Sequence, residues 1–142
     1  MTTAAKSTQG VEFQIETDTP GTYEVIAEVT NFQAPGAIAS EIEVTSFDST
    51  WVERIGGMKD GDAFSIDYNY VFANSGQQRL SASVALTKNF RIELNDAATP
   101  TRIAFAAVVT AVPGPSGGVN EAQKVSGATG RVSGVVTVTP GT

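Results

Sequence analysis

The side chains that could carry chemistry in this sequence are mainly carboxylates, because the chain contains no histidine and no cysteine. Without histidine it lacks the commonest general base and the commonest transition-metal ligand. Without cysteine it can form neither disulfides nor thiolate metal sites. A Ser-His or Cys-His nucleophilic centre is therefore excluded within the chain, and we expect neither enzymatic activity nor a cofactor.

Two groups of carboxylates have a suggestive spacing. One group in DGDAFSID could bind Ca²⁺ but lacks the glycine and distal glutamate of an EF-hand, which favours acidic turn residues: Asp60, Asp62 and Asp67. The other group could act as paired glycosidase carboxylates, although its regular alternation is more typical of a solvated strand face: Glu24, Glu28, Glu41 and Glu43. The nearby GGMKDGD (56–62) lacks the spacing of a phosphate-binding loop.

The net charge of −6 is concentrated in the first third of the chain. Residues 1–46 contain seven acidic side chains and one lysine, whereas residues 63–142 carry a small positive excess. Tight binding to a phosphate backbone needs clustered Lys and Arg, so the first third is not expected to bind nucleic acid. An acidic surface facing a solvent-filled space or a basic partner fits this asymmetry.

The hydrophobic pattern predicts strands on both sides of one helix, within a single domain over 11–142 that follows a flexible arm, 1–10. Period-two alternation or apolar runs predict strands at 11–16, 23–32, 41–47, 63–72, 90–94, 102–112 and 126–139. Ser75 and Gln78 have capping-box spacing and predict a helix over 76–87. Pro/Gly-rich turns are expected at 18–23, 33–40 and 113–123. This order predicts a mainly β fold, a β-sandwich or barrel with one flanking α-helix.

Two further predictions concern how the strands are arranged. The segments 23–32 and 41–47 are expected to pair as an antiparallel hairpin, which would gather the four glutamates on one face. The segment 102–112 is apolar on both faces and is expected to be a central buried strand.

The aromatic row of 63–72 allows two interpretations. Its members could stack on bases or sugars, but strict period-two spacing is more typical of a core or an intersubunit surface: Phe64, Ile66, Tyr68, Tyr70 and Phe72.

The segment 46–62, SFDSTWVERIGGMKDGD, contains the only tryptophan of the chain. It is expected to be a long loop, either a mobile surface loop whose tryptophan packs locally or a docking element. Anchor-type side chains interleaved with charges are typical of an interface hot spot: Trp51, Val52, Arg54, Ile55, Met58 and Lys59.

The sequence from 23 to 139 resembles the tail tube proteins (major tail proteins) of long-tailed bacteriophages with non-contractile tails. The resemblance rests on many weak positions rather than on a chemical motif: Val44, Thr45, Asp48, Glu53, Gly57, Asp60, Asp62, Gln77, Gln78, Leu80, Phe90, Arg91 and Ile92. Unlike some members, the chain is not expected to carry an immunoglobulin-like C-terminal extension, and its 113–123 loop is longer than a tight hairpin.

The resemblance implies a structural virion protein that forms hexameric rings, which stack into a hollow tube. The lumen would hold the tape-measure protein and conduct DNA during ejection without binding it specifically. Further partners would be the tail terminator and tail-tip proteins. The chain would be assembled in the bacterial cytoplasm, and no membrane insertion is expected. Residues 46–62 would become the ring-stacking loop, and the arm 1–10 would order on assembly.

Combined with this resemblance, the charge pattern predicts that Glu24, Glu28, Glu41 and Glu43 face the lumen, where six copies would repel DNA phosphates. Two other functions stay open at this point. One is a ring or tube protein of a gene-transfer particle or injection system. The other is a carbohydrate-binding β-sandwich that uses Trp51, Tyr68 and Tyr70.

Overall fold

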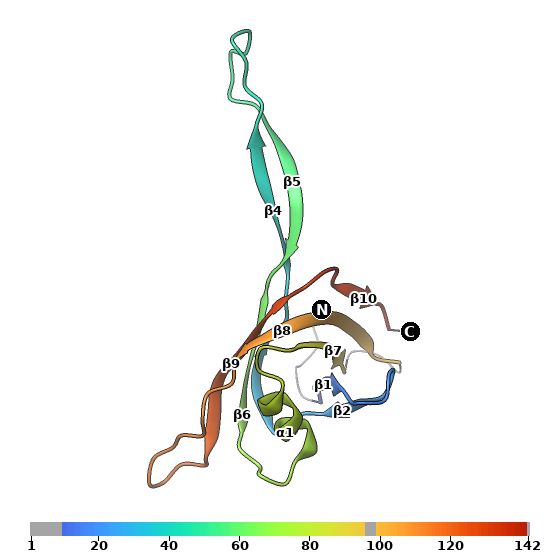
Figure 1. Ribbon diagram of the computed structural model, residues 1–142, viewed down its shortest axis with the longest axis vertical. Coiled ribbons are helices and arrows are strands. Elements are labelled where there is room, and N and C mark those ends of the chain that lie inside the picture. Colours follow the sequence, from blue (N-terminus) through green and yellow to red (C-terminus); the bar gives the residue numbers. More distant parts are fainter. Residues whose placement is uncertain (1–9, 96–98, 142) are drawn as a thin grey trace, which may run out of the picture.

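The computed structural model describes residues 10–95 and 99–141, which form a rolled antiparallel sheet with one helix and one long projecting hairpin (Figure 1). The elements are β1 Glu12–Glu16, β2 Tyr23–Val25, β3 Val29–Gln33, β4 Ala37–Glu43, β5 Arg54–Gly61, β6 Ala63–Asn69, α1 Ser75–Ala82, β7 Thr87–Leu94, β8 Thr101–Ala111, β9 Lys124–Val132 and β10 Thr137–Thr139. The mainly β class with one helix is therefore confirmed. The predicted arm lies almost wholly outside the described residues.

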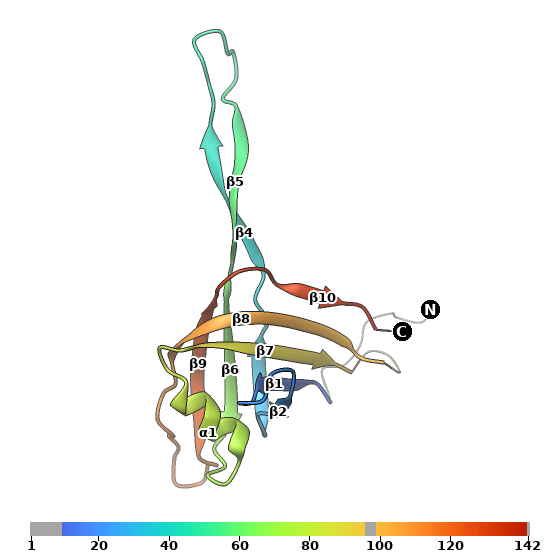
Figure 2. The ribbon, with the colours of Figure 1, turned by 45° about the vertical axis from the view of Figure 1, so that its right-hand side comes forward.

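Eight of the strands form one sheet in the order β2-β1-β7-β8-β9-β6-β3, and β10 pairs with β8. Although β2 and β3 are neighbours in sequence, they stand at opposite ends of this path. The sheet curls around its core so that its two ends approach each other, while α1 contacts β1 and β2 (Figures 1 and 2). We call this rolled sheet with α1 the barrel.

The core of the barrel is built from strands that alternate as the sequence predicts. In β6 the side chains of Phe64, Ile66 and Tyr68 are buried, and those between them are half-buried. Four phenylalanines from four strands meet at the centre with ring centroids 4.9 to 6.4 Å apart: Phe13, Phe64, Phe90 and Phe105. Aromatic contacts of this kind are worth about 0.5–1.5 kcal/mol per pair beyond the area that they bury.

The predicted strand over 23–32 is wrong as a single element, because the chain breaks between β2 and β3. In an unbroken strand Ile26 would share a face with Glu24 and Glu28. It is instead buried in the core, and its N–H donates to the carbonyl of Phe13. Two residues later Glu28 has a φ of 61°, in the left-handed region. This turn redirects the chain from one end of the sheet to the other.

The predicted pairing of 23–32 with 41–47 is also wrong. β3 pairs with β6, and β4 pairs with β5, a strand lying inside the segment expected to be a loop. The hydrophobic pattern does not predict this strand, because the register shifts and the alternation is lost at Gly56, Gly57 and Met58.

Other details also differ from the prediction. The helix begins one residue earlier and ends at Ala82, since its N-cap is Asn74 rather than Ser75, and Gln78 donates its amide to the Phe72 carbonyl instead of completing a capping box. The strand 126–139 is divided in two at Gly134, whose φ is 101°. β8 is central as predicted but is fully buried on one face only, because Ala104, Ala106 and Val108 are half-buried.

A glycine in β9 gives a direct test of this packing. A Cβ on Gly130 would lie 2.6 Å from the Phe64 ring and 2.6 Å from the Val108 carbonyl oxygen. We expect Gly130→Ala to lower the free energy of unfolding by about 1–3 kcal/mol, as overpacking of a close-packed core does. Urea denaturation measures this, with Gly114→Ala as the control because its Cβ would meet nothing within 4 Å. Equal stability of the two variants would contradict the packing described.

Candidate assembly surface

The hairpin formed by β4 and β5, which we call the projecting hairpin (37–61), extends away from the barrel along the longest axis of the molecule (Figures 1 and 2). Its strands pair antiparallel, with Ile42 opposite Ile55 and Glu43 opposite Arg54. An isolated two-stranded hairpin is at best marginally stable in water. The projecting hairpin therefore depends on the barrel at its root and on whatever covers its surface.

The alternation of β4 and its register with β5 give the projecting hairpin two different faces. Ile38, Ile42 and Ile55 share the apolar face, with about half of each side chain exposed. Met58, beside the register shift, is 85% exposed. An exposed apolar surface of this kind is typical of an interaction site.

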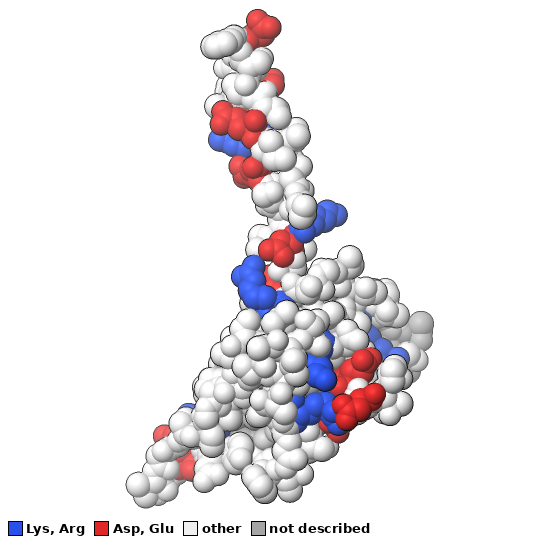
Figure 3. All heavy atoms as spheres, in the orientation of Figure 1, with Lys and Arg blue, Asp and Glu red and all other residues white. Residues whose placement is uncertain are grey.

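The opposite face of the projecting hairpin is charged and balanced. Glu41, Glu43, Arg54 and Lys59 lie on it, and the Nε of Arg54 is 3.2 Å from Glu41 Oε2. Acidic and basic side chains alternate with uncharged surface along the hairpin (Figure 3). This face is suited to solvent or to a polar partner rather than to burial in a core.

The tip of the hairpin (44–53) is held by hydrogen bonds within the tip itself. The N–H of Val44 donates to the Glu53 carbonyl, the N–H of Glu53 donates to Thr45 Oγ1, and the N–H of Ser49 donates to the Ser46 carbonyl. Its two aromatic side chains do not pack against the rest of the tip: Phe47 is fully exposed and Trp51 is 83% exposed. The interpretation in which the tryptophan packs locally is therefore wrong.

The root of the hairpin is fixed to the barrel. The N–H of Asp62 donates to the Gly36 carbonyl, and Asp60 is paired with Arg131 of β9. A Cβ on Gly61 would lie 2.4 Å from Val132, so a side chain is not accommodated there. The hairpin is therefore held firmly where it leaves the sheet.

The six predicted docking residues all lie on the projecting hairpin, but on different parts of it. Trp51 and Val52 belong to the tip, Ile55 to the apolar face, and Arg54 and Lys59 to the charged face, while Met58 stands at the register shift. Four further exposed apolar residues were missed: Ile38, Ile42, Val44 and Phe47. The alternation of 41–47 does place Ile42 on an apolar face. Because this strand was expected to pair within the main sheet, Ile42 was not recognised as exposed.

The four glutamates do not share one face, which corrects the predicted gathering. Glu41 and Glu43 lie on the charged face of the hairpin, whereas Glu28 accepts a hydrogen bond from the Asn69 side chain at the end of β6. Glu24 lies beside α1, where it is paired with Arg79. The cause is the break at Glu28, which separates β2 from β3.

At the opposite end of the barrel, two amides fasten α1 to the sheet. Asn74 Oδ1 accepts from the N–H of Gln77 and from the N–H of Ala27. The buried Gln77 side chain donates to the carbonyls of Ala27 and Asn69 and accepts from the N–H of Val71. Both N–H donors and the oxygen of this amide are thereby engaged close to the chain break.

Arg79 adds a charged fastening on the outer side of α1. Its guanidinium contacts Glu24 and lies 3.0 Å from Asp18, and the hydroxyl of Ser75 donates to Glu24. Partial burial raises the pKa of Glu24, but the hydrogen bonds from Arg79 and Ser75 outweigh that effect, so the pKa is lowered from its usual value.

A site that combines Trp51, Tyr68 and Tyr70 is excluded by this geometry. Tyr68 is 1% exposed within the core, while Trp51 belongs to the segment that connects β4 to β5, which lies far from the barrel (Figure 1). The carbohydrate-binding alternative, as predicted from those three residues, is therefore wrong.

Other classes of site find little support in the described part of the chain. Over residues 10–95 and 99–141, no three acidic side chains are grouped so that they could hold a metal ion. Asp60 is paired with Arg131, and Asp67 accepts from the N–H of Gly127. The one described helix is too short to cross a membrane.

Comparison with solved structures identifies the architecture. A chain in the tail of an empty gene transfer agent (GTA) particle, a structure with C6 symmetry, is 16% identical and aligns with a TM-score of 0.74 over 95% of this chain and 99% of that one. A chain in the SPP1 tail tube is 17% identical, with a TM-score of 0.64 over 93% of this chain and 77% of that one. The chain has a tail-tube fold.

The same tail-tube fold extends to another kind of particle. A chain in the sixfold-symmetrised baseplate of the anti-feeding prophage is 12% identical and aligns with a TM-score of 0.64 over 99% of this chain and 98% of that one. No protein-family model matches the sequence, and no curated protein matches it either. The likeness therefore lies in the three-dimensional fold, beyond what sequence similarity retains.

Within the tail-tube fold, the fastening of α1 predicts a pH dependence. Because the pKa of folded Glu24 is lowered, its pairing stabilises the fold above the unfolded-state pKa and is lost as the pH falls through the folded-state pKa. We expect Glu24→Gln to be less stable than the wild type at pH 7 and the difference to shrink toward zero under acid conditions. Thermal unfolding from pH 7 to pH 3 checks this.

The matched control is Glu43→Gln, which replaces a carboxylate that makes no ion pair with any described residue. This variant should follow the wild type across the same pH range. A stability difference for Glu24→Gln that stays constant with pH would contradict the proposed electrostatic fastening.

Proposed function

We propose that this chain is a structural subunit that polymerises as stacked hexameric rings into the hollow tube of a tail. The observation that carries the proposal is a tail-tube fold bearing a projecting hairpin whose apolar face and tip are uncovered in the single chain. A subunit with this much unpartnered apolar surface is suited to permanent assembly. It acts by self-association, without catalysis.

In this proposal the tube encloses the tape-measure protein and conducts DNA during ejection without binding it specifically. Tail terminator and tail-tip proteins cap its two ends, and the assembled tube belongs to the virion. A phage tail is the first candidate. A gene-transfer particle or an injection system is the second, favoured by the likeness to the GTA tail and to the anti-feeding prophage baseplate.

We propose that the projecting hairpin forms contacts between subunits, with Trp51, Val52, Ile55 and Met58 as apolar anchors and Arg54 and Lys59 as their polar surroundings. Truncation of anchors of this type costs the most binding free energy, because their side chains are fully desolvated in the complex. In the single chain the apolar anchors contribute little to folding, since more than half of each side chain is already exposed to water.

The double variant Trp51→Ala, Ile55→Ala tests this role. We expect an unchanged melting temperature for the unassembled chain and at least about a tenfold rise in the concentration needed for polymerisation, the effect of losing a hot spot. Light scattering gives the threshold, and negative-stain microscopy distinguishes tubes, lone rings and monomers.

Val138→Ala is the control, because Val138 is an apolar residue of the barrel that is about as exposed as Ile55, at 56% against 53%. It should polymerise at the wild-type concentration. If the double variant forms tubes as readily as this control, the hairpin is not the anchor. If the wild-type protein stays monomeric at every concentration, the tube proposal itself fails.

The lumen-facing role of the acidic residues also remains a proposal. Because the four glutamates do not share one face, the role can apply to only some of them. We propose it now for Glu41 and Glu43 on the charged face, because Glu24 is engaged with α1. Replacing both with lysine would give that face a positive charge, and particles carrying the variant should eject DNA more slowly. Normal ejection from intact tails of the double variant would remove the role.

A further inference from the structure

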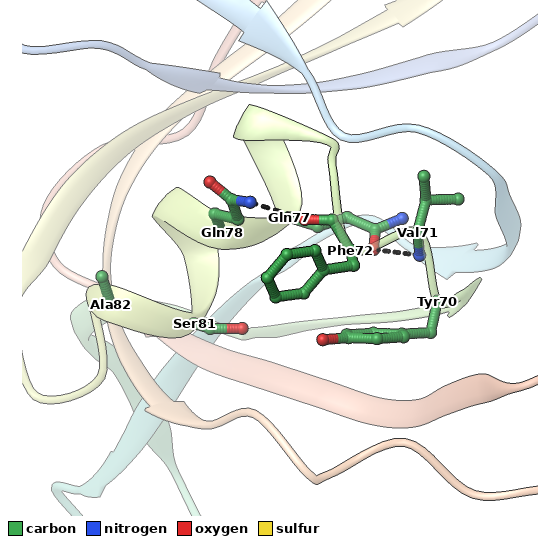
Figure 4. A pocket seen from close by; sticks show the side chains of 7 residues that line it. All are labelled: Tyr70, Val71, Phe72, Gln77, Gln78, Ser81 and Ala82. Carbon is green, nitrogen blue, oxygen red and sulfur yellow. Dashed lines mark hydrogen bonds between the residues drawn. The ribbon is translucent and has the colours of Figure 1, made fainter.

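A groove lies between α1 and the chain segment that connects it to β6. Its cavity of about 380 Å³ is lined by Tyr70, Val71, Phe72, Gln77, Gln78, Ser81 and Ala82 (Figure 4). We call it the α1 groove. Phe72 is 76% exposed there, so a large aromatic side chain is presented to solvent at this end of the barrel.

The walls of the α1 groove are held in place before any partner arrives. Gln77 accepts from the N–H of Val71, and Gln78 donates to the carbonyl of Phe72, which fixes the backbone on both sides of the exposed ring. A site whose side walls are fixed in advance loses less conformational entropy when it binds.

The chemistry of the groove matches an aromatic side chain that has a polar edge. The rings of Tyr70 and Phe72 stand on two sides of the space, and the hydroxyls of Tyr70 and Ser81 are directed into it (Figure 4). A buried indole needs apolar contact on its faces and a hydrogen-bond acceptor for its N–H. Hydroxyl oxygens can supply that acceptor.

Trp51, the only indole of this chain, lies at the other end of the molecule. The hairpin tip and α1 are separated along the longest axis in both ribbon views (Figures 1 and 2). Copies stacked in one direction join unlike surfaces, so the upper end of one copy must fit the lower end of the next. An exposed tryptophan at one end and an open aromatic groove at the other satisfy that requirement.

Charge also favours this contact. The tip, residues 44–53, carries Asp48 and Glu53 and no basic residue. A second hollow on the other side of α1 shares Gln78 and Ala82 with the groove, and its charged lining is Asp18, Arg79 and Lys88. Arg79 is already paired with Asp18 and Glu24, which leaves Lys88 as the charge of this hollow that forms no ion pair with a residue in the described ranges. Lys88 is therefore available to an acidic tip.

We propose that Trp51 of one copy inserts into the α1 groove of a copy in the adjacent ring, with the Tyr70 and Phe72 rings against the indole. The proposal deepens the tube function above and rests on it. It assigns the receptor for the hairpin tip to a second copy of this chain and makes Phe72 a stacking residue.

Cysteine cross-linking tests the contact, because the natural chain contains no cysteine. The variant Thr50→Cys, Ala82→Cys places one thiol beside Trp51 and one on the rim of the groove, leaving both aromatic partners intact. In assembled tubes we expect oxidation or a short bismaleimide to give a ladder of covalent oligomers extending beyond six subunits. The control Thr50→Cys, Val138→Cys moves the second thiol to the barrel side and should give little linkage.

The outcomes separate this inference from the tube proposal. Tubes that form normally but link no better than the control would overturn the groove contact and leave the tube intact. Linkage that stops at a closed hexamer would place the contact within a ring, which also overturns it. A wild-type chain that forms no tubes would remove the tube proposal and this contact together.

Tryptophan fluorescence provides a second measurement that needs no cysteine. Because Trp51 is the only tryptophan and is 83% exposed in the single chain, its emission should shift to shorter wavelength on polymerisation. Phe72→Ala should raise the polymerisation threshold at least about tenfold and reduce this shift. Val119→Ala is the control, since Val119 is fully exposed in the loop before β9. Equal thresholds and shifts in the two variants would contradict the proposal.

Discussion

A single buried amide, that of Gln77, joins the three chain segments on which closure of the barrel depends. It hydrogen-bonds to Ala27 at the break between β2 and β3, to Asn69 at the end of β6, and to Val71 in the connection to α1. The break sends β2 and β3 to opposite ends of the sheet, and β6 is the partner of β3. Without this amide, the backbone groups of Ala27, Asn69 and Val71 that it contacts would lose these hydrogen bonds where the two ends of the sheet meet. Burying unsatisfied backbone groups is costly in free energy.

The molecule divides its apolar side chains between two purposes. In the barrel they form a phenylalanine-centred core that is almost completely buried, and they stabilise the single chain. On the projecting hairpin half or more of most large apolar side chains is exposed to water, and that exposed area contributes to stability only when another surface covers it. The glycine at the root and the ion pair between Asp60 and Arg131 connect the two parts without a shared core.

Much of the barrel could be predicted from the sequence, because local alternation decides it. Phe64, Ile66 and Tyr68 mark β6 without ambiguity, and the resemblance to tail tube proteins predicted the fold that the comparisons confirm. The pairing of strands was not predictable in the same way. It depends on Glu28, a residue that in sequence looks like one more exposed strand position but takes a left-handed conformation.

The candidate surface shows the same limit. Composition was sufficient to single out Trp51 and its neighbours, but the glycines at 56 and 57 concealed that these neighbours lie on a strand with two distinct faces. The α1 groove has almost no signal in the local sequence pattern, because it forms where α1 meets the segment that connects it to β6. Its helical wall was predicted from capping chemistry, whereas Phe72 was expected to continue a strand.

The slenderness of the projecting hairpin has a mechanical consequence for any filament built from this chain. A two-stranded ribbon with a register shift at adjacent glycines resists bending far less than a rolled sheet with a packed core. If successive rings are connected through such ribbons, curvature is absorbed at the joints and the barrels keep their shape. Flexibility of the whole tail then comes from the connectors, and its bore stays open while it bends.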